Sequence, residues 1–249
     1  MRDNFFSKKG YISIIELAKQ KGYRISPVEK VRRVKTGNTP LLVLRHDVDL
    51  DLQAALLMAM MEKDMRVHST FFVHLYNNHY NSLSPEGRLI IKKISSLGHE
   101  IGLHWDSRDH PHDLERKLAR DRDILAEIIG KQVMSGSQHK PTSTPQVKFH
   151  AILKYEMYRD FIYISDSAMK WRQFTPWQLL KKKQNIHLLA HPFWWMIKGK
   201  TREEKFFNHF KNITLNNKKN IKKELEHMSH SLKYRKRYDS YFGYFNKIV

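Results

Sequence analysis

The chain has 249 residues, a hydrophobic share of 41% and a formal net charge of +20 at pH 7. This length and share of apolar residues suit one large domain with its own core, or a domain with an extension. The sequence has no cysteine, which excludes disulfides, thiolate metal sites and cysteine nucleophiles. Any metal must therefore bind His, Asp, Glu or water.

The N-terminal residues 1–9 are polar and charged, and no apolar stretch reaches the roughly 18 residues that a membrane span requires. We therefore expect a cytoplasmic protein, with a membrane-peripheral position as the alternative. The positive charge suits nucleic acid, an acidic glycan or an anionic membrane, and charge alone does not choose among them.

Short β-branched or apolar runs alternate with longer helical patterns through the middle of the chain. We predict an amphipathic helix over 13–21, then helices that begin after Asp49 or Asp51, span 84–98 and span 114–129. The predicted strands are 41–45, 67–73, 99–104, 132–135, 161–165 and 186–190.

This alternation is typical of α/β proteins with a parallel sheet or barrel. We predict a core domain over 40–197, preceded by a helix and loop over 1–39 that pack on it. Residues 198–249 contain 14 Lys and Arg against 5 Asp and Glu, with few branched aliphatics. We predict that they form a basic, mainly helical extension.

Chemistry in such folds lies at the carboxyl ends of the strands. The residues at and after four predicted strands, 45–49, 99–106, 135–141 and 191–192, carry His or Asp. A single Asp or His there is usually a helix cap or a hydrogen-bonded loop residue. One Asp and two or three imidazoles together suit zinc or another divalent metal, and hence hydrolysis of an amide or ester.

These residues resemble the polysaccharide deacetylase superfamily, the NodB-homology domains of carbohydrate esterase family 4. Residues 98–104 match its Gly-His-Glu-Ile-Gly-x-His motif, residues 69–73 its second strand, and residues 188–191 its late Leu-x-x-His motif. Together with Asp166 and Trp171, the match covers most of 41–192. The resemblance implies a distorted (β/α) barrel, an early Asp motif that supplies base and metal ligand, a metal-binding His and a late acid His.

The chain departs from the family pattern in three motifs. The adjacent aspartates of the first motif are replaced by Asp47-Val48-Asp49, and the place of the second metal His is taken by Arg108. The third motif is replaced by Ser-Gly-Ser-Gln-His-Lys-Pro over 135–141. This set resembles a divergent branch associated with surface-polysaccharide biosynthesis.

Roles for these residues follow from the resemblance and from strand periodicity. Asp47 and Asp49 lie two apart, so on a strand they point the same way and either could be the base. His110 and His112 are alternatives to His139 as the second imidazole ligand. The site that we predict has Asp47 as general base, His191 as general acid, and Asp49, His104 and His139 as metal ligands.

We assign substrate binding to Asp166 and to three tryptophans whose rings either stack on sugars or pack the barrel rim, Trp171, Trp194 and Trp195. The predicted function is metal-dependent hydrolysis of an N- or O-linked acetyl group from a sugar or polysaccharide intermediate, with zinc as the expected metal. The alternative is a non-hydrolytic carbohydrate-binding or scaffold protein on the same fold.

Two further partners follow from the charge. We expect peripheral contact with anionic membrane through the basic C-terminal segment. We do not expect nucleic-acid binding, because the sequence has no recognition-helix or stacking-strand motif.

Overall fold

A computed structural model describes residues 5–31, 39–106, 108, 113–140 and 161–229. The chain divides into two compact units, Met1–Lys198 and Gly199–Val249. Within the described ranges, no helix combines the length and apolar character needed to cross a membrane.

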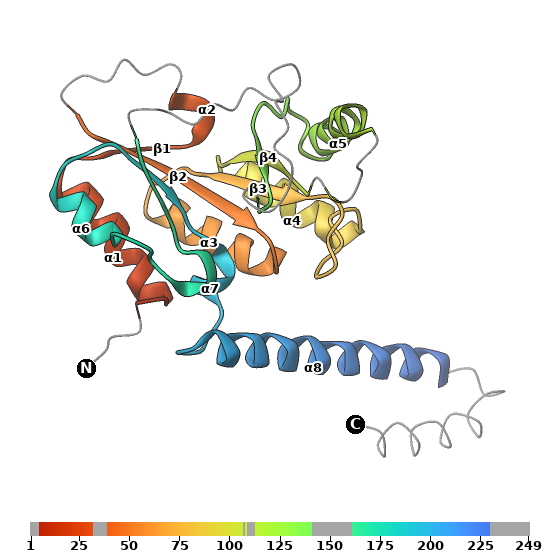
Figure 1. Cartoon of the computed structure of the whole chain (residues 1–249). Coiled ribbons are helices and arrows are strands. Elements are labelled where there is room, and N and C mark those ends of the chain that lie inside the picture. Colours follow the sequence, from red (N-terminus) through yellow and green to blue (C-terminus); the bar gives the residue numbers. More distant parts are fainter. Residues whose placement is uncertain (1–4, 32–38, 107, 109–112, 141–160, 230–249) are drawn as a thin grey trace. The chain divides into compact units, whose positions relative to one another are not determined.

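The first unit is built on a seven-stranded sheet in which all pairings are parallel (Figure 1). The order is β5-β4-β3-β2-β7-β6, and β1 pairs with the start of β2. Among the described residues no ladder joins β5 to β6, and the described strands form a curled half-barrel. The predicted α/β class and parallel sheet are confirmed. The strands are β1 Arg24–Ser26, β2 Leu41–Val48, β3 Thr70–His74, β4 Glu100–Trp105, β5 Gly136–Gln138, β6 Ile162–Ser165 and β7 Ile186–Leu189.

Helices pack against one another in an order that follows the strands. Contacts link α5 to α4, α4 to α3, α3 to α7, α7 to α1 and α1 to α6, which is the order of the sheet from β5 to β6. The second unit contains α8, Arg202–Ser229. The helices of the first unit are α1 Lys8–Gln20, α2 Val28–Val31, α3 Leu52–Asp64, α4 Pro85–Ser96, α5 Leu114–Ile129, α6 Pro176–Lys181 and α7 Pro192–Met196, with a 3-10 turn at Ser167–Met169.

The capping residues explain where the helices begin. Asp51, one of the two candidates, caps α3 by accepting hydrogen bonds from the backbone N–H groups of Gln53 and Ala54. The prediction for α1 was wrong at its start. Ser7 accepts from the N–H of Gly10, and the helix therefore begins at Lys8 rather than near residue 13.

The predicted strand over 132–135 was wrong, because the ladder begins later. The N–H of Leu103 donates to the carbonyl of Ser135 at 3.0 Å, and Leu103 pairs with Gly136. Hydrogen bonding to β4 therefore fixes the start of β5, which the apolar run alone does not reveal. The short strand β1, which pairs with Leu41–Val43 of β2, was missed for the same reason.

Alternation along β2 sends its side chains to two different environments. Val43 points to one face, where it packs with Val28 and Val31 of α2. Asp47 lies on that same face four residues on. His46 points to the other face, toward α1 and α3. Because side chains alternate along β2, Asp47 and the candidate site lie on one face of the sheet, and helices α1 and α3 lie on the other.

A buried network on the helix side anchors β2. Glu62 of α3 is fully buried, accepts hydrogen bonds from the Tyr11 hydroxyl and from Ser69 Oγ, and lies 2.9 Å from His46 Nε2. Burial alone would raise the pKa of Glu62, but the neighbouring His46 outweighs burial and lowers it. His46 Nδ1 donates to the carbonyl of Ala190 at 2.8 Å, because a carbonyl oxygen only accepts. The network therefore ties α1, α3, β2 and the end of β7 together.

Replacing Tyr11 with Phe tests this anchor. It removes a hydrogen bond to a buried carboxylate and should lower the free energy of unfolding by about 2–3 kcal/mol. Tyr23→Phe is the matched control, since it removes a hydroxyl that donates to the carbonyl of Gln184 at 2.9 Å, and it should cost about 1 kcal/mol. Urea unfolding measures both, and equal losses would show that the network adds nothing beyond an ordinary hydrogen bond.

Candidate metal and acid–base site

Four side chains meet at the carboxyl edge of the sheet. Asp49 follows β2, His74 ends β3, His104 lies near the end of β4, and His139 follows β5. One ligand atom of each lies within 4.8 Å of those of the others. Asp49 Oδ1 is 3.3 Å from His104 Nε2, 3.6 Å from His139 Nδ1 and 3.8 Å from His74 Nε2. We call these four residues the His₃Asp cluster.

The hydrogen bonds of His104 leave one ring nitrogen available for a metal. Its Nδ1 donates to the carbonyl of Ser137 at 2.7 Å, which fixes that nitrogen as the protonated one in the neutral ring. Its Nε2 and Asp49 Oδ1 are both buried, and neither has a hydrogen-bond partner among the described residues. Two buried, unpartnered ligand atoms facing one another suit a cation between them.

The pKa shifts of two members of the cluster also favour a cation. Burial works to raise the pKa of Asp49, but the imidazoles of His104 and His139 beside its carboxylate outweigh burial and hold the pKa well below its usual range. Burial, aided by the charge of His104, lowers the pKa of His74 well below its usual range. An ionised carboxylate and a neutral imidazole are the forms that bind metals.

Asp47 lies beside the cluster and is held by Arg45. Arg45 Nε donates to Asp47 Oδ1 at 2.8 Å and its Nη2 to Oδ2 at 2.7 Å, because residues two apart on a strand share a face. Ser137 Oγ also lies 3.3 Å from this carboxylate. Burial alone would raise the pKa of Asp47, but Arg45 and then His104 outweigh burial and keep it far below its usual range. Asp47 is therefore an oriented anion.

Asp166 and His191 form a second acid–base pair. His191 Nδ1 lies 2.5 Å from Asp166 Oδ1, and its backbone N–H donates to Oδ2 at 2.9 Å. Trp195 Nε1 donates to the same Oδ2 at 2.6 Å. Burial works to lower the pKa of His191, but the charge of Asp166 outweighs it and raises the pKa to about 9. His191 Nε2 points to the cluster, 3.6 Å from Asp49 Oδ2.

The structure brings together all five residues predicted for catalysis and metal binding, and adds one that the sequence analysis missed. His74 was missed because the second strand was predicted to end at Val73. The sequence carried one signal, since His74 directly follows this predicted strand, but its register with His104 on the neighbouring strand is seen only in the structure. His110 and His112, the alternatives to His139, lie outside the described residues.

Arg108, at the place of the family's second metal His, turns to a different partner. Its Nε donates to Asp106 Oδ1 at 2.9 Å, and this guanidinium is mostly exposed. Of the candidates named for the second imidazole, His139 lies beside His104, and its backbone N–H donates to the carbonyl of Trp105 at 2.7 Å.

The residues predicted to bind substrate are more buried than that role requires. Asp166 is fully buried and orients His191. Trp195 is buried too, and its ring packs against Phe6 at 5.1 Å and Tyr11 at 5.5 Å. Trp194 is buried beside Phe193, while the partly exposed Trp171 stacks on Phe6. In this structure these side chains pack the fold around the site.

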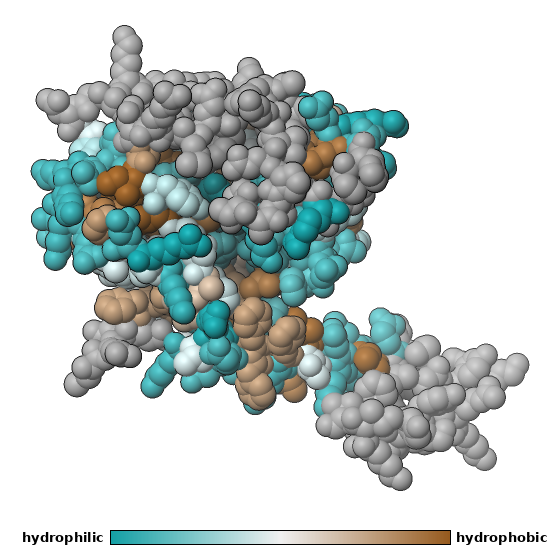
Figure 2. Space-filling model, in the orientation of Figure 1, coloured by the Kyte–Doolittle hydropathy of each residue, from teal (hydrophilic) through white to brown (hydrophobic). Residues whose placement is uncertain are grey.

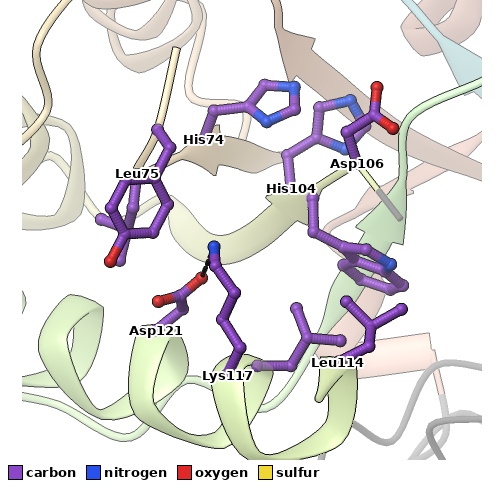
Figure 3. Close-up of a pocket in the computed structure, with 10 residues that line it drawn as sticks. His74, Leu75, His104, Asp106, Leu114, Lys117 and Asp121 are labelled. Atoms are coloured by element: carbon purple, nitrogen blue, oxygen red, sulfur yellow. Dashed lines mark hydrogen bonds and ion pairs between the residues drawn. The ribbon is translucent and has the colours of Figure 1, made fainter. Parts of the chain in front are cut away.

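A pocket adjoins the cluster on the side of α5. Figure 3 shows Lys117 and Asp121 of α5 as an ion pair below His74 and His104, with Nζ 3.1 Å from Oδ2. The Lys117 ammonium also lies 3.8 Å from the centre of the Tyr76 ring. Because the pair neutralises itself, this side of the cluster adds little net charge to it.

His74→Ala tests whether the missed residue is a metal ligand. Loss of a ligand should weaken zinc affinity by more than the roughly 10- to 100-fold associated with loss of an outer partner. His79→Ala, which removes an exposed imidazole from the loop after β3, is the control and should leave affinity unchanged. Calorimetric titration of the metal-free protein measures both, and equal affinities for the two variants would remove His74 from the site.

Asp166→Asn tests the origin of the His191 pKa. Removing the carboxylate charge should lower this pKa from about 9, because the buried ring then loses the anion that favours its charged form. Glu204→Gln, an exposed change in the second unit, should leave it unchanged. The imidazole proton shifts of the metal-free protein, followed by NMR across pH, report the value directly.

Comparisons with known proteins add little to what the geometry of the site indicates. No family model and no curated protein matches the chain. Among solved structures, the chain is similar to the peptidoglycan deacetylase PdaC from Bacillus subtilis, with 15% sequence identity and a TM-score of 0.40, over 80% of this chain and 99% of that one. Likeness at this level leaves the function to be argued from the site.

Proposed function

We propose that this protein is a metal-dependent hydrolase of the polysaccharide deacetylase type, which removes an acetyl group from a sugar or polysaccharide intermediate. The observation that carries the proposal is that three groups of side chains meet at one edge of the sheet. They are the His₃Asp cluster, the Arg45–Asp47 pair and the Asp166–His191 pair. A ligand set, an anion and a protonated imidazole are the components of hydrolysis at a metal site.

Zinc is the metal that we propose for the cluster. Asp49, His74, His104 and His139 would hold it, because three imidazoles and one carboxylate are nitrogen and oxygen donors of the kind that zinc takes. Catalytic zinc sites keep a position for water or substrate and can expand to five ligands. The bound cation would polarise the acyl carbonyl and promote ionisation of a water molecule.

Asp47 is the general base in this proposal. Its carboxylate is ionised and oriented by Arg45, and its Oδ2 lies 3.7 Å from His104 Nε2, beside the cluster. It accepts a proton from the water as the new carbon–oxygen bond forms. Arg45 then stabilises the position of the carboxyl group through its two N–H groups.

His191 is the general acid. Asp166 keeps its ring protonated at neutral pH and fixes its orientation through Nδ1, so Nε2 is free to donate toward the cluster. Its proton passes to the leaving nitrogen or oxygen as the bond to the acetyl carbon breaks. The products are acetate and the free amine or hydroxyl of the sugar.

The sequence resemblance supports the substrate class and a place in surface-polysaccharide biosynthesis. Of the tryptophans that we expected to stack on the sugar, Trp194 and Trp195 are buried and Trp171 is partly exposed.

Substitution of the two aspartates separates base from ligand. Asp47→Asn should retain zinc and lower the rate of acetate release by roughly two to four powers of ten, which is the range for a lost general base. Asp49→Asn should weaken zinc affinity first, because it removes the anionic ligand. Acetate release from an acetylated chitooligosaccharide and metal content of the purified variants are the measurements.

Asp51→Asn is the matched control, since Asn also caps helices and this residue lies outside the cluster. It should retain both metal and activity. If Asp47→Asn and Asp49→Asn also retained both, the aspartates would be structural. If the wild-type protein bound zinc and the substrate but released no acetate, the non-hydrolytic carbohydrate-binding alternative would replace the proposal.

A further inference from the structure

Helix α8 of the second unit exposes large apolar side chains along much of its length. Phe207 is 68% exposed, Phe210 52%, Ile213 37% and Ile221 39%. Figure 2 shows tan and brown atoms gathered on α8. A helix of 28 residues is about 42 Å long, so the exposed apolar side chains extend over several turns.

The apolar residues share one side of the helix. With about 100° of rotation per residue, Phe207, Phe210, Ile213 and Ile221 fall within an arc of roughly 120°. This arc matches the width of an amphipathic face that packs against another surface. Leu215, which is 45% exposed, lies outside the arc. We call the four residues of the arc the α8 stripe.

Lysines border the α8 stripe. Lys211, Lys218 and Lys222 follow one edge of the arc, at successive spacings of seven and four residues. The 52 residues from 198 onward carry 14 Lys and Arg against 5 Asp and Glu. An apolar face with a lysine-rich border is complementary to a surface that is apolar inside and anionic outside.

We propose that α8 binds the surface of an anionic lipid bilayer and lies in its plane. The stripe enters the boundary between headgroups and acyl chains, and the bordering lysines contact lipid phosphates and carboxylates. Length does not distinguish such helices from spanning ones, and the polar far side of α8 favours the surface position.

Charge argues against a second copy of this chain as the occupant. Pairing two stripes would bring the bordering lysines of both copies together, in a chain whose net charge is +20. Such like-charge contacts disfavour self-association. The same charge favours an anionic bilayer.

Cosedimentation of the full-length protein with lipid vesicles tests the proposal. Binding should be at least about tenfold stronger to phosphatidylcholine vesicles containing phosphatidylserine than to pure phosphatidylcholine. It should weaken as salt rises from about 0.1 M to about 0.5 M, because exposed charges are then screened. The double variant Phe207→Asp, Phe210→Asp and the double variant Lys218→Glu, Lys222→Glu should each lower binding at least about tenfold.

The double variant Asn212→Asp, Asn216→Asp is the matched control. It adds the same two negative charges at exposed positions outside the stripe and away from its lysine border, so it should leave vesicle binding unchanged. Retained helical circular dichroism in every variant excludes loss of the helix as the cause.

Three results would overturn the proposal: equal binding to both vesicle types, equal effects of the stripe variant and the Asn212, Asn216 control, or a dimer in ultracentrifugation that the stripe variant abolishes. The last result would assign the stripe to self-association.

Discussion

Strand β2 is held along both edges, by β3 and by β7, and a shift of its register by one residue would exchange the faces on which its side chains lie. His46 would then leave Glu62 on the helix side, and Asp47 would turn away from Ser137 and His104 on the other side. Such a shift would remove polar contacts on both faces of the sheet, so the side chains of both faces stabilise the observed register. The candidate site depends on this register, since β2 supplies Arg45, Asp47 and the approach to Asp49.

Three buried carboxylates each have a basic side chain within 3 Å. Arg45 lies beside Asp47, His46 beside Glu62 and His191 beside Asp166. Asp49 differs, because its neighbours are imidazoles at 3.3 Å or more and one of its oxygens has no hydrogen-bond partner among the described residues. A buried carboxylate is costly to leave uncompensated, and a cation among the imidazoles would complete the balance.

The helix-side network and the site meet at the end of β7. The carbonyl of Ala190 accepts from His46, and the next residue is His191, whose ring is fixed by Asp166 and indirectly by Trp195. The residues that orient the acid are thus themselves held by the core. The buried Trp195 therefore helps to position His191 through Asp166. Its sequence position had suggested stacking on a sugar ring.

Local periodicity and neighbouring residues were enough to predict the alternation of strands and helices, helix starts after Asp49 or Asp51 and at residue 84, and the concentration of His and Asp at strand ends. The resemblance of 98–104 to a family motif singled out His104. Which side chains meet depends instead on the tertiary structure. Strand pairing set the start of β5 and aligned His74 with His104, and packing turned Trp195 inward. Such choices depend on hydrogen bonds and contacts between residues far apart in the chain, to which no local pattern is sensitive.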